Sequence, residues 1–379
     1  MTKSVIEDAS NGECTEVLAD EPKSIILGII AQLSKGADLH RVTLPTFVLE
    51  PRSLLEKLSD FISHPDLIID VNKVDDPVER FVSVVRFYLS GWHIRPKGVK
   101  KPYNPILGEF FKCQYCYPND TRATYIAEQV SHHPPISAFH MASPANNLIV
   151  RGEMRPKSKF LGNSVASISD GITHVEFTDR KETYDIAYPN VYARGIVFGT
   201  MIMELADTSS VRCKQTDLIC ELEFKAKGYF SGSYNMLCGV IKRVSTGEKL
   251  YELSGKWSEI LYIKDCKTGE KREFFNALKA KIIPKACLPL EKQDWNESRR
   301  LWNDVTTALK ANNIDAATAA KSAIEDDQRA RRKEQEANNA QHEARFFRHI
   351  PGVLGKNSGP GEWVLKSEGL SDLDSFVQF

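Results

Sequence analysis

Two adjacent histidines are the residues of this chain whose types and spacing most strongly suggest chemistry. His132 and His133 follow the segment Glu128-Gln129-Val130-Ser131, and two prolines come directly after them. Pro134 disfavours helical backbone at the residue before it, so we expect both rings to be held on extended chain. Because an imidazole gains a proton near neutral pH, such a pair can grip an anionic group such as phosphate.

Hydrolysis and metal binding are the two other chemistries that adjacent histidines can serve. Ser131 could act as a nucleophile, but neighbours on a strand point to opposite faces, so no triad with His132 is predicted. Cys113 and Cys116 have the spacing of half a zinc site, yet no second cysteine or histidine pair completes four ligands. We therefore expect no catalytic residue, no metal and no cofactor.

An anion site needs further cations, and two other segments can supply them. Residues 100–105, Lys-Lys-Pro-Tyr-Asn-Pro, place two lysines and an amide on a proline-stiffened turn. Lys321, Glu325 and Arg329 recur every four residues, which puts them on one face of a helix. Such a ladder is most often a solvated helix face. Beside Lys101 and two histidines, it favours a phosphate clamp.

Helix signals occur on both sides of the central region. Residues 53–62 combine a Ser-x-x-Glu capping box with an apolar stripe. Residues 76–91 combine an aspartate cap, a proline at the first helical position and a glycine stop. Residues 301–309 carry another stripe, and a polar, alanine-rich helix is predicted from Asp315 toward Arg348.

The hydrophobic period changes to two between about residues 123 and 264. In residues 221–227 every second side chain is charged, as in a strand with one wet and one buried face. Residues 240–244 and 249–253 flank a four-residue turn and predict a hairpin. Curling into a barrel protects the edges of such a long antiparallel sheet. The order of helices, sheet and helices indicates an α+β fold.

Length and composition exclude several classes of protein. The 379 residues include 50 basic and 50 acidic ones, and this zero net charge argues against a general nucleic-acid binder. The longest apolar stretch, residues 25–31, is far shorter than the ~20 residues of a membrane-spanning helix. The N-terminus lacks the basic flank and apolar segment of a secretory signal, so a cytosolic location is expected.

The run EQVSHHPP resembles the signature of the oxysterol-binding-protein-related (Osh/ORP) lipid-transfer proteins. KKPYNPILGE, KGYFSGSYN and KSAIEDDQR share this likeness, while LPTFVLEPRSLLE, FYLSGWHIRPKGVKKP and PKSKFLGNS are most similar to the fungal Osh branch that carries phosphatidylserine. The resemblance implies an incomplete antiparallel β-barrel that encloses a lipid tunnel, with an N-terminal lid and flanking helices. Tyr103 departs from the leucine usual in this family and is expected to face away from the clamp.

The composition and the resemblance together divide the chain into five parts. They are a disordered acidic tail at 1–23, a lid at 24–52, a helical segment leading into the barrel at 53–122, the antiparallel barrel at 123–285, and a C-terminal helical subdomain at 286–379. The resemblance implies lipid contacts from Leu44 and Thr46 on the lid. It further implies an anion clamp made of Lys101, Asn104, His132, His133, Lys321, Glu325 and Arg329.

The implied function is cytosolic exchange of phosphatidylserine and phosphatidylinositol 4-phosphate between the endoplasmic reticulum and the plasma membrane. We expect a monomer that contacts anionic membranes transiently, is peripheral at contacts between these organelles, and does not bind nucleic acid. A sterol exchanger, a lipid sensor without transport and a lipid-modifying enzyme are the alternatives. Residues 273–277, Glu-Phe-Phe-Asn-Ala, resemble a motif that docks on an endoplasmic-reticulum tethering protein, although burial of the phenylalanines explains them more simply.

Overall fold

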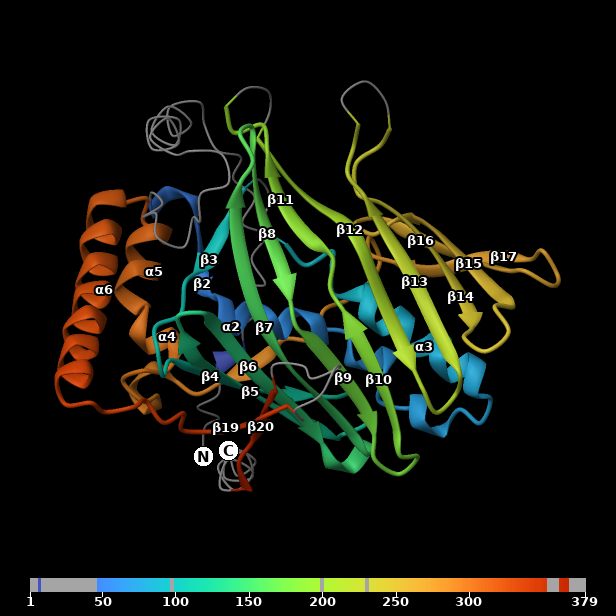
Figure 1. The fold of residues 1–379 in the computed structure, drawn as a ribbon, viewed down its shortest axis with the longest axis horizontal. Helices are drawn as coiled ribbons and strands as arrows, with labels where there is room; N and C mark the ends of the chain where they lie inside the picture. The colour runs from blue at the N-terminus through green and yellow to red at the C-terminus, as the bar shows by residue number, and fades with distance from the viewer. Residues whose placement is uncertain are drawn as a thin grey trace.

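The computed structural model describes residues 6–7, 46–95, 99–197, 201–228, 232–352 and 361–367. In this part of the chain one sheet of 16 strands forms the body of the molecule (Figure 1). Its order is β1-β18-β4-β5-β6-β7-β8-β11-β12-β13-β14-β15-β16-β17, with β9 and β10 bridging β7 and β12. All its pairings are antiparallel, and among the described strands the two ends of the order do not meet. The predicted α+β fold with an incomplete antiparallel barrel is confirmed.

The strands of this sheet are β1 (Ile6–Glu7), β4 (Phe110–Cys116), β5 (Arg122–His132), β6 (Pro135–Ser143), β7 (Leu148–Phe160), β8 (Ser164–Asp170), β9 (Ile172–Phe177), β10 (Glu182–Ala187), β11 (Asn190–Arg194), β12 (Ile202–Cys213), β13 (Leu218–Lys225), β14 (Met236–Arg243), β15 (Lys249–Lys256), β16 (Ile260–Asp265), β17 (Lys271–Asn276) and β18 (Lys285–Cys287). Two small sheets pair β2 (Leu49–Ser53) with β3 (Lys101–Tyr103), in parallel, and β19 (Phe347–Ile350) with β20 (Glu362–Leu365). The α-helices are α2 (Leu54–Lys57), α3 (Pro77–Ser90), α4 (Ser298–Leu301), α5 (Asn303–Lys310) and α6 (Ile314–Ala337). Short 3-10 helices are η2 (Thr46–Val48), η3 (Leu58–Ile62), η4 (Pro65–Leu67), η5 (Val71–Lys73), η6 (Pro144–Asn146) and η7 (Leu290–Lys292).

Helix α3 begins and ends where the sequence predicts. The carboxylate of Asp76 accepts the backbone N–H groups of Val78 (2.7 Å) and Glu79 (3.2 Å), and Pro77 occupies the first helical position. Gly91 is the C-cap, and a Cβ at this position would lie 2.8 Å from the Cα of Phe61. The glycine therefore also permits a close approach between α3 and η3.

The capping box predicted at residues 53–56 forms only in part. Ser53 is the N-cap of α2, and its hydroxyl lies 3.4 Å from the N–H of Leu55. Glu56 does not return to the cap, because Arg299 binds its carboxylate at 2.7 Å. The predicted single helix is instead the short α2 followed by η3.

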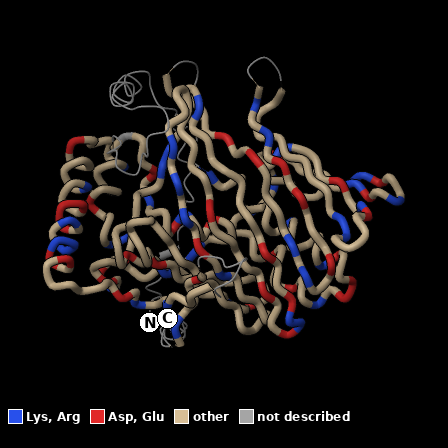
Figure 2. The backbone as a smooth tube through the Cα atoms, in the orientation of Figure 1, with Lys and Arg blue, Asp and Glu red and all other residues tan. Residues whose placement is uncertain are grey.

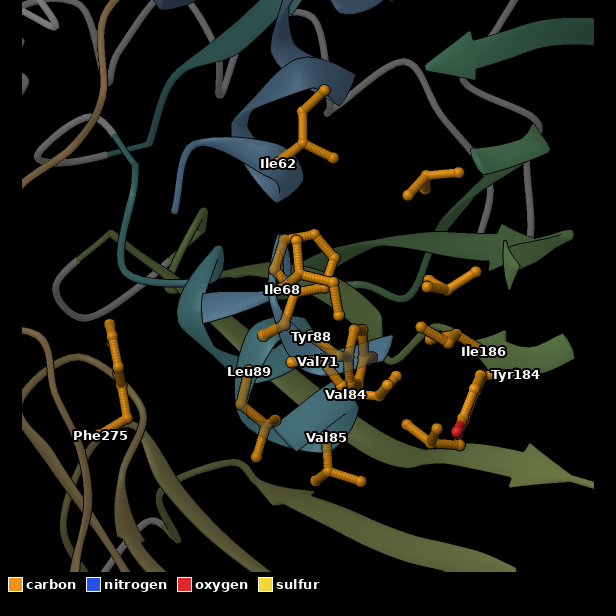
Figure 3. Packing of buried hydrophobic residues seen from close by; sticks show 14 of the residues in the cluster. Ile62, Ile68, Val71, Val84, Val85, Tyr88, Leu89, Tyr184, Ile186 and Phe275 are labelled. Atoms are coloured by element: carbon orange, nitrogen blue, oxygen red, sulfur yellow. The ribbon is translucent and has the colours of Figure 1, made fainter. Parts of the chain in front are cut away.

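The main core lies between α2, α3 and one face of the sheet (Figure 3). Val84, Val85 and Tyr88 of α3 are fully buried against strand residues such as Tyr184 and Ile186. At the edge of this core the imidazoles of His64 and His93 contact each other, with 2.8 Å between their Nε2 atoms, and both pack on Phe275. Burial lowers the pKa of each of these histidines to about 4.

A second core covers the opposite face of β5 and β6. The hairpin of β19 and β20 lies against β6 and β7, where Phe346 packs edge-on against Phe110 of β4. Glu128 of β5 is buried on this face and accepts the backbone N–H groups of Arg345 (2.7 Å) and Phe346 (2.8 Å). The glutamate of the EQVSHHPP run therefore holds the C-terminal segment.

Several predicted boundaries differ from the structure. Strand β4, which precedes residue 123, already belongs to the sheet. The sequence did not reveal this strand because Phe110, Phe111 and Cys113 are all buried, so polar and apolar residues do not alternate in β4. Within the expected acidic tail, residues 6–7 pair with β18. The C-terminal part contains β19 and β20 besides helices, and α6 ends at Ala337 rather than near Arg348.

The structure also tests the motif at residues 273–277. Phe274 and Phe275 are 5% and 7% exposed, so their side chains belong to the core and are not free to dock on another protein. Among the described residues, no helix is long and apolar enough to cross a bilayer.

Candidate functional site

The three charged residues of the predicted ladder lie together on α6. Lys321 Nζ donates to Glu325 Oε1 at 2.7 Å, and Arg329 Nη2 lies 3.7 Å from Glu325 Oε2. Arg329 is also paired with Asp326. The Lys321 side chain is only 14% exposed, whereas that of Arg329 is 63% exposed. Lys321, at one end of the ladder, is therefore partly desolvated, and Arg329, at the other end, is open to solvent.

Lys101 joins this ladder from β3. Burial lowers its pKa, the positive charge of Lys321 lowers it further, and the negative charge of Glu325 opposes both effects. Glu325 pairs with both Lys321 and Arg329, Asp326 is a second partner of Arg329, and the charge of Glu325 also acts on Lys101. Three cations against these two carboxylates leave an excess of positive charge, which an anionic ligand could neutralise.

Tyr103 and Thr46 fix the surroundings of Lys101. Tyr103 stacks on Trp302, with 4.8 Å between the ring centroids, and its hydroxyl lies 2.9 Å from Thr306 Oγ1 of α5. It thus faces α5. The buried Thr46 places its Oγ1 2.7 Å from Thr318 Oγ1, one turn before Lys321 on α6. Leu44 lies outside the described residues.

The two histidines occupy the turn between β5 and β6. His132 Nδ1 and His133 Nε2 are 3.1 Å apart, and the two rings are nearly perpendicular at 87°. His132 is half-buried and His133 is exposed. The Ser131 hydroxyl donates to the carbonyl of Pro134 at 2.7 Å and so closes the turn. The peptide bond between His133 and Pro134 is cis.

Gln129 shapes the backbone that carries this turn. The pairing of β5 with β6 shifts register between Gln129 and Ser131. The buried amide of Gln129 spans the shift, because its Nε2 donates to the carbonyl of Ser131 (2.8 Å) and its Oε1 accepts from the hydroxyl of Ser137 (2.6 Å). This contact positions the histidines, and the sequence reasoning did not identify it.

The loop after β3 connects the lysine to the histidine strand. Asn104 is exposed on this loop. Four residues later the N–H of Gly108 donates to the carbonyl of Gln129 (3.0 Å), and the N–H of Gln129 donates to the carbonyl of Glu109 (2.8 Å). The predicted clamp residues thus form a cluster on β3 and α6 and a pair on β5, linked by this loop.

Glu109 is the buried centre of the linkage. Its Oε1 accepts from the hydroxyls of Ser53 (2.5 Å) and Ser298 (2.7 Å), and its Oε2 accepts from Trp302 Nε1 (2.9 Å) and the N–H of Ile106 (3.1 Å). Burial raises the pKa of this carboxyl, and the four donors partly oppose the rise. One side chain therefore ties together β2, the loop and α4.

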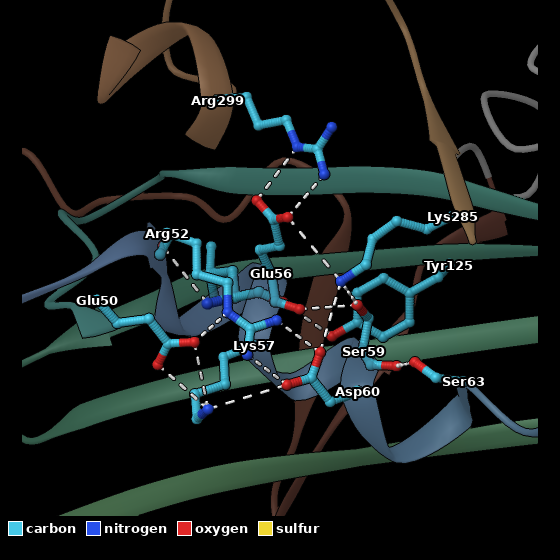
Figure 4. Close-up of polar contacts among 12 residues, drawn as sticks. Glu50, Arg52, Glu56, Lys57, Ser59, Asp60, Ser63, Tyr125, Lys285 and Arg299 are labelled. Carbon is cyan, nitrogen blue, oxygen red and sulfur yellow. Dashed lines mark hydrogen bonds and ion pairs between the residues drawn. The ribbon is translucent and has the colours of Figure 1, made fainter. Parts of the chain in front are cut away.

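A buried ion network lies beneath β2 (Figure 4). Arg52 donates to both carboxylate oxygens of Asp60, at 2.6 Å each, and also pairs with Glu50. Lys285 lies 3.6 Å from Asp60 Oδ1 and donates to Ser59 Oγ at 2.8 Å. Burial alone would raise the pKa of Asp60, but Arg52 and Lys285 lower it below the ordinary value. The network also contains Glu56, Lys57 and Arg299.

No sequence motif marks this network. Its only signals are charged residues at otherwise apolar positions, such as Asp60 between Leu58 and Phe61. Within the described residues, no group of three or more histidine, cysteine or acidic side chains could hold a metal ion. Cys113 is buried and Cys116 exposed, so the two point to opposite faces of β4.

The structure therefore combines a large curved antiparallel sheet with a separate cationic cluster on β3 and α6. A family model described as "Oxysterol-binding protein" matches residues 28–308 and 303–372. The chain is 47% identical over 373 residues to an oxysterol-binding protein homolog of Schizosaccharomyces pombe. The aligned region covers 95% of this chain and 76% of the relative. The chain is 44% identical to oxysterol-binding protein homolog 7 of Saccharomyces cerevisiae, over 86% of this chain and 76% of the relative. The chain therefore belongs to the oxysterol-binding protein family of lipid-transfer proteins.

Solved structures show the same fold. The Osh1 ORD domain in complex with cholesterol matches with a TM-score of 0.78 at 23% identity, covering 95% of this chain and 90% of that domain. The Osh3 ORD in complex with PI(4)P from Saccharomyces cerevisiae matches with a TM-score of 0.68 at 21% identity, covering 96% of this chain and 94% of the other.

Proposed function

We propose that this protein extracts phosphatidylserine and phosphatidylinositol 4-phosphate and exchanges them between the endoplasmic reticulum and the plasma membrane. The observation that carries the proposal is the cluster of Lys101, Lys321 and Arg329 around Glu325, linked through the loop after β3 to the histidine pair. Such a cluster suits the phosphate of a lipid head group. Leu44 and Thr46 would lie beside the head group, and the barrel would enclose the acyl chains.

Energetics explain why such a carrier is needed. At ~0.8 kcal/mol for each buried methylene, a lipid with about thirty methylenes resists leaving a bilayer by something on the order of 20 kcal/mol. A dry tunnel would replace that apolar environment. Both ligands would need the same clamp and tunnel, so binding of one would exclude the other, and a cytosolic monomer would carry one lipid at a time.

We propose a non-enzymatic role and no cofactor. The most obvious nucleophile beside the histidines, Ser131, uses its hydroxyl to close the turn at Pro134. The lipid is bound and released unchanged in this proposal, and the partners are anionic membranes. A tethering protein of the endoplasmic reticulum would have to bind elsewhere than Phe274 and Phe275, which are buried. A sterol exchanger is the second candidate, since the matching Osh1 domain is in complex with cholesterol.

Mass spectrometry of the lipids that co-purify with the protein tests the ligand directly. Phosphatidylserine and phosphatidylinositol 4-phosphate are expected, and sterol alone would favour the second candidate. Transfer between donor and acceptor vesicles separates a carrier from a sensor. Leu44→Asp should reduce phosphatidylserine uptake more than phosphoinositide uptake, because it places a charge beside the anionic head group. Equal loss of both would show that the lid closes the tunnel without selecting the lipid.

A further inference from the structure

Three strand connections at one end of the barrel each expose a large apolar side chain. Leu161 follows β7, Val197 follows β11 and Tyr234 precedes β14, and their exposed fractions are 40%, 42% and 42%. We call these three the tip residues. The strands β7, β11 and β13 run in the same direction, so the connections that follow them lie at the same end of the sheet, the upper end in Figure 1.

Hydrogen bonds join the three connections into one row. The N–H of Val197 donates to Asn163 Oδ1 at 2.8 Å, and the N–H of Ile196 donates to the carbonyl of Asn163 at 3.2 Å. On the other side, Arg194 NH1 donates to the carbonyl of Lys227 at 2.7 Å. The connection after β11 is thus bonded to the connection after β7 on one side and to the start of the connection after β13 on the other.

One cation lies at or beside each connection, namely Lys159 near the end of β7, Arg194 at the end of β11 and Lys227 after β13. The described residues 159–163, 194–197, 226–228 and 232–235, which cover these cations and the tip residues, contain no aspartate or glutamate. In Figure 2 basic positions lie near the upper ends of these strands, and residues of both signs are scattered over the lower part of the barrel.

The three cations differ in their surroundings. Arg194 is paired with Glu204 at 2.6 Å, and this carboxylate lies on β12 below the row. Lys227 places its Nζ 4.4 Å from the centroid of the Tyr234 ring, and Lys159 is exposed. Lys159 and Lys227 therefore give the row its positive potential.

We propose that this row is a docking surface for an anionic lipid bilayer. Apolar side chains of this size gain free energy at the boundary between head groups and acyl chains, while neighbouring lysines stay among the anionic head groups. The positive charge of Lys159 and Lys227 complements such a membrane. Helix α6, with Lys321 near its start, begins at the same end of the molecule (Figure 1). Docking would therefore turn the clamp of the proposed function toward the membrane.

The docking surface can be tested separately from lipid extraction. Sedimentation of the full chain is measured with vesicles of phosphatidylcholine and phosphatidylglycerol, which contain neither proposed ligand. The variant Leu161→Ala/Val197→Ala/Tyr234→Ala is expected to bind at least about tenfold more weakly than the wild type. The matched control is Ile172→Ala/Val244→Ala, which removes side chains that are 46% and 40% exposed away from the row, at the start of β9 and in the connection after β14. This control is expected to bind like the wild type.

Two further measurements identify the nature of the contact. Lys159→Gln/Lys227→Gln should weaken binding to anionic vesicles and leave any binding to pure phosphatidylcholine unchanged. In Leu161→Trp, the fluorescence of the new indole should shift to shorter wavelength when anionic vesicles are added. Melting temperatures within a few degrees of the wild type confirm that each variant is folded.

The proposal is overturned if the tip variant binds anionic vesicles as the wild type does, if the control loses as much affinity, or if the new indole shows no shift. Absence of vesicle binding by the wild type overturns it too. A wild-type protein that docks but extracts no phospholipid would refute the proposed function and leave the docking surface standing.

Discussion

The indole N–H of Trp302 donates to Glu109 Oε2 at 2.9 Å inside the protein. This bond connects the loop that carries Asn104 to the helical segment that leads to α6. Because the other oxygen of Glu109 accepts from Ser53 and Ser298, one buried carboxylate serves donors from three regions of the chain. The clamp cluster thus depends on a residue that is itself fully buried.

Replacing Glu109 should be costly for stability. Glu109→Leu keeps much of the volume but leaves four donors without their acceptor, and we expect a loss of about 3–5 kcal/mol in the free energy of unfolding. Urea denaturation measures it. Glu223→Leu, at an exposed position of β13, is the control and should change stability little. Equal stability of the Glu109 variant and the wild type would contradict a central role for this carboxylate.

The histidine pair should matter for ligand binding and not for folding. His132→Ala/His133→Ala removes two side chains that are half-buried or exposed and contact each other. We expect extraction of phosphatidylinositol 4-phosphate from liposomes to be abolished, with nearly the same melting temperature as the wild type. A variant that unfolds at ordinary temperature yet still binds the lipid would show that the histidines are structural.

Arg329 tests whether the ladder is a binding site or a solvated helix face. Arg329→Glu places a negative charge beside Glu325 and any bound phosphate, and should weaken phosphoinositide binding by about 2–5 kcal/mol while phosphatidylserine extraction persists. The control is Arg332→Glu, which breaks the exposed pair with Glu336 further along α6. Unchanged phosphoinositide affinity in Arg329→Glu would assign the ladder to the helix surface alone.

Sequence reasoning anticipated local features better than long-range ones. The cap of α3 and the hairpin of β14 and β15 are specified by neighbouring residues, and both form as predicted. The spacing of Lys321, Glu325 and Arg329 likewise fixed their common helix face. Glu109 and the network around Arg52 could not be predicted this way, because their partners come from distant segments. Strand β4 showed no strand period in the sequence because its side chains are buried on both faces of the sheet.

The contact between the buried His64 and the half-buried His93 predicts an acid-sensitive fold. Burial lowers the pKa of both to about 4, from an ordinary value of about 6.5, so the unfolded chain takes up protons first as the pH falls. The stability that the neutral pair contributes is complete above about pH 6.5 and is lost between about pH 6.5 and pH 4.

The urea concentration at the midpoint of unfolding should therefore decrease as the pH is lowered from about 6.5 to about 4. The decrease should be smaller in His64→Gln/His93→Gln. The buried His140, whose pKa is also lowered to about 4, acts in the same direction and remains in both proteins. Parallel pH profiles for the two proteins would contradict this role of the pair.

Gly171 should not tolerate a side chain. Its φ is +131°, and a Cβ there would lie 2.1 Å from the carbonyl oxygen of Glu153. We expect Gly171→Ala to lower the free energy of unfolding by about 3 kcal/mol or more. Gly247 is a fitting comparison because its φ is also positive, at +72°, with no atom within 4 Å of a Cβ. Gly247→Ala should cost only about 1 kcal/mol. Similar losses of unfolding free energy in both variants would show that the backbone at Glu153 moves aside at little cost.

The grip of Glu128 on the C-terminal segment has a consequence for biosynthesis. Its carboxylate binds the N–H of Arg345, which is 217 residues later in the chain. While the chain emerges from the ribosome, the β5 surface around Ile126 and Val130 lacks the cover that Phe346 later provides. This second core can therefore close only after the segment around Phe346 has been synthesised, and until then the apolar surface is open to chaperones.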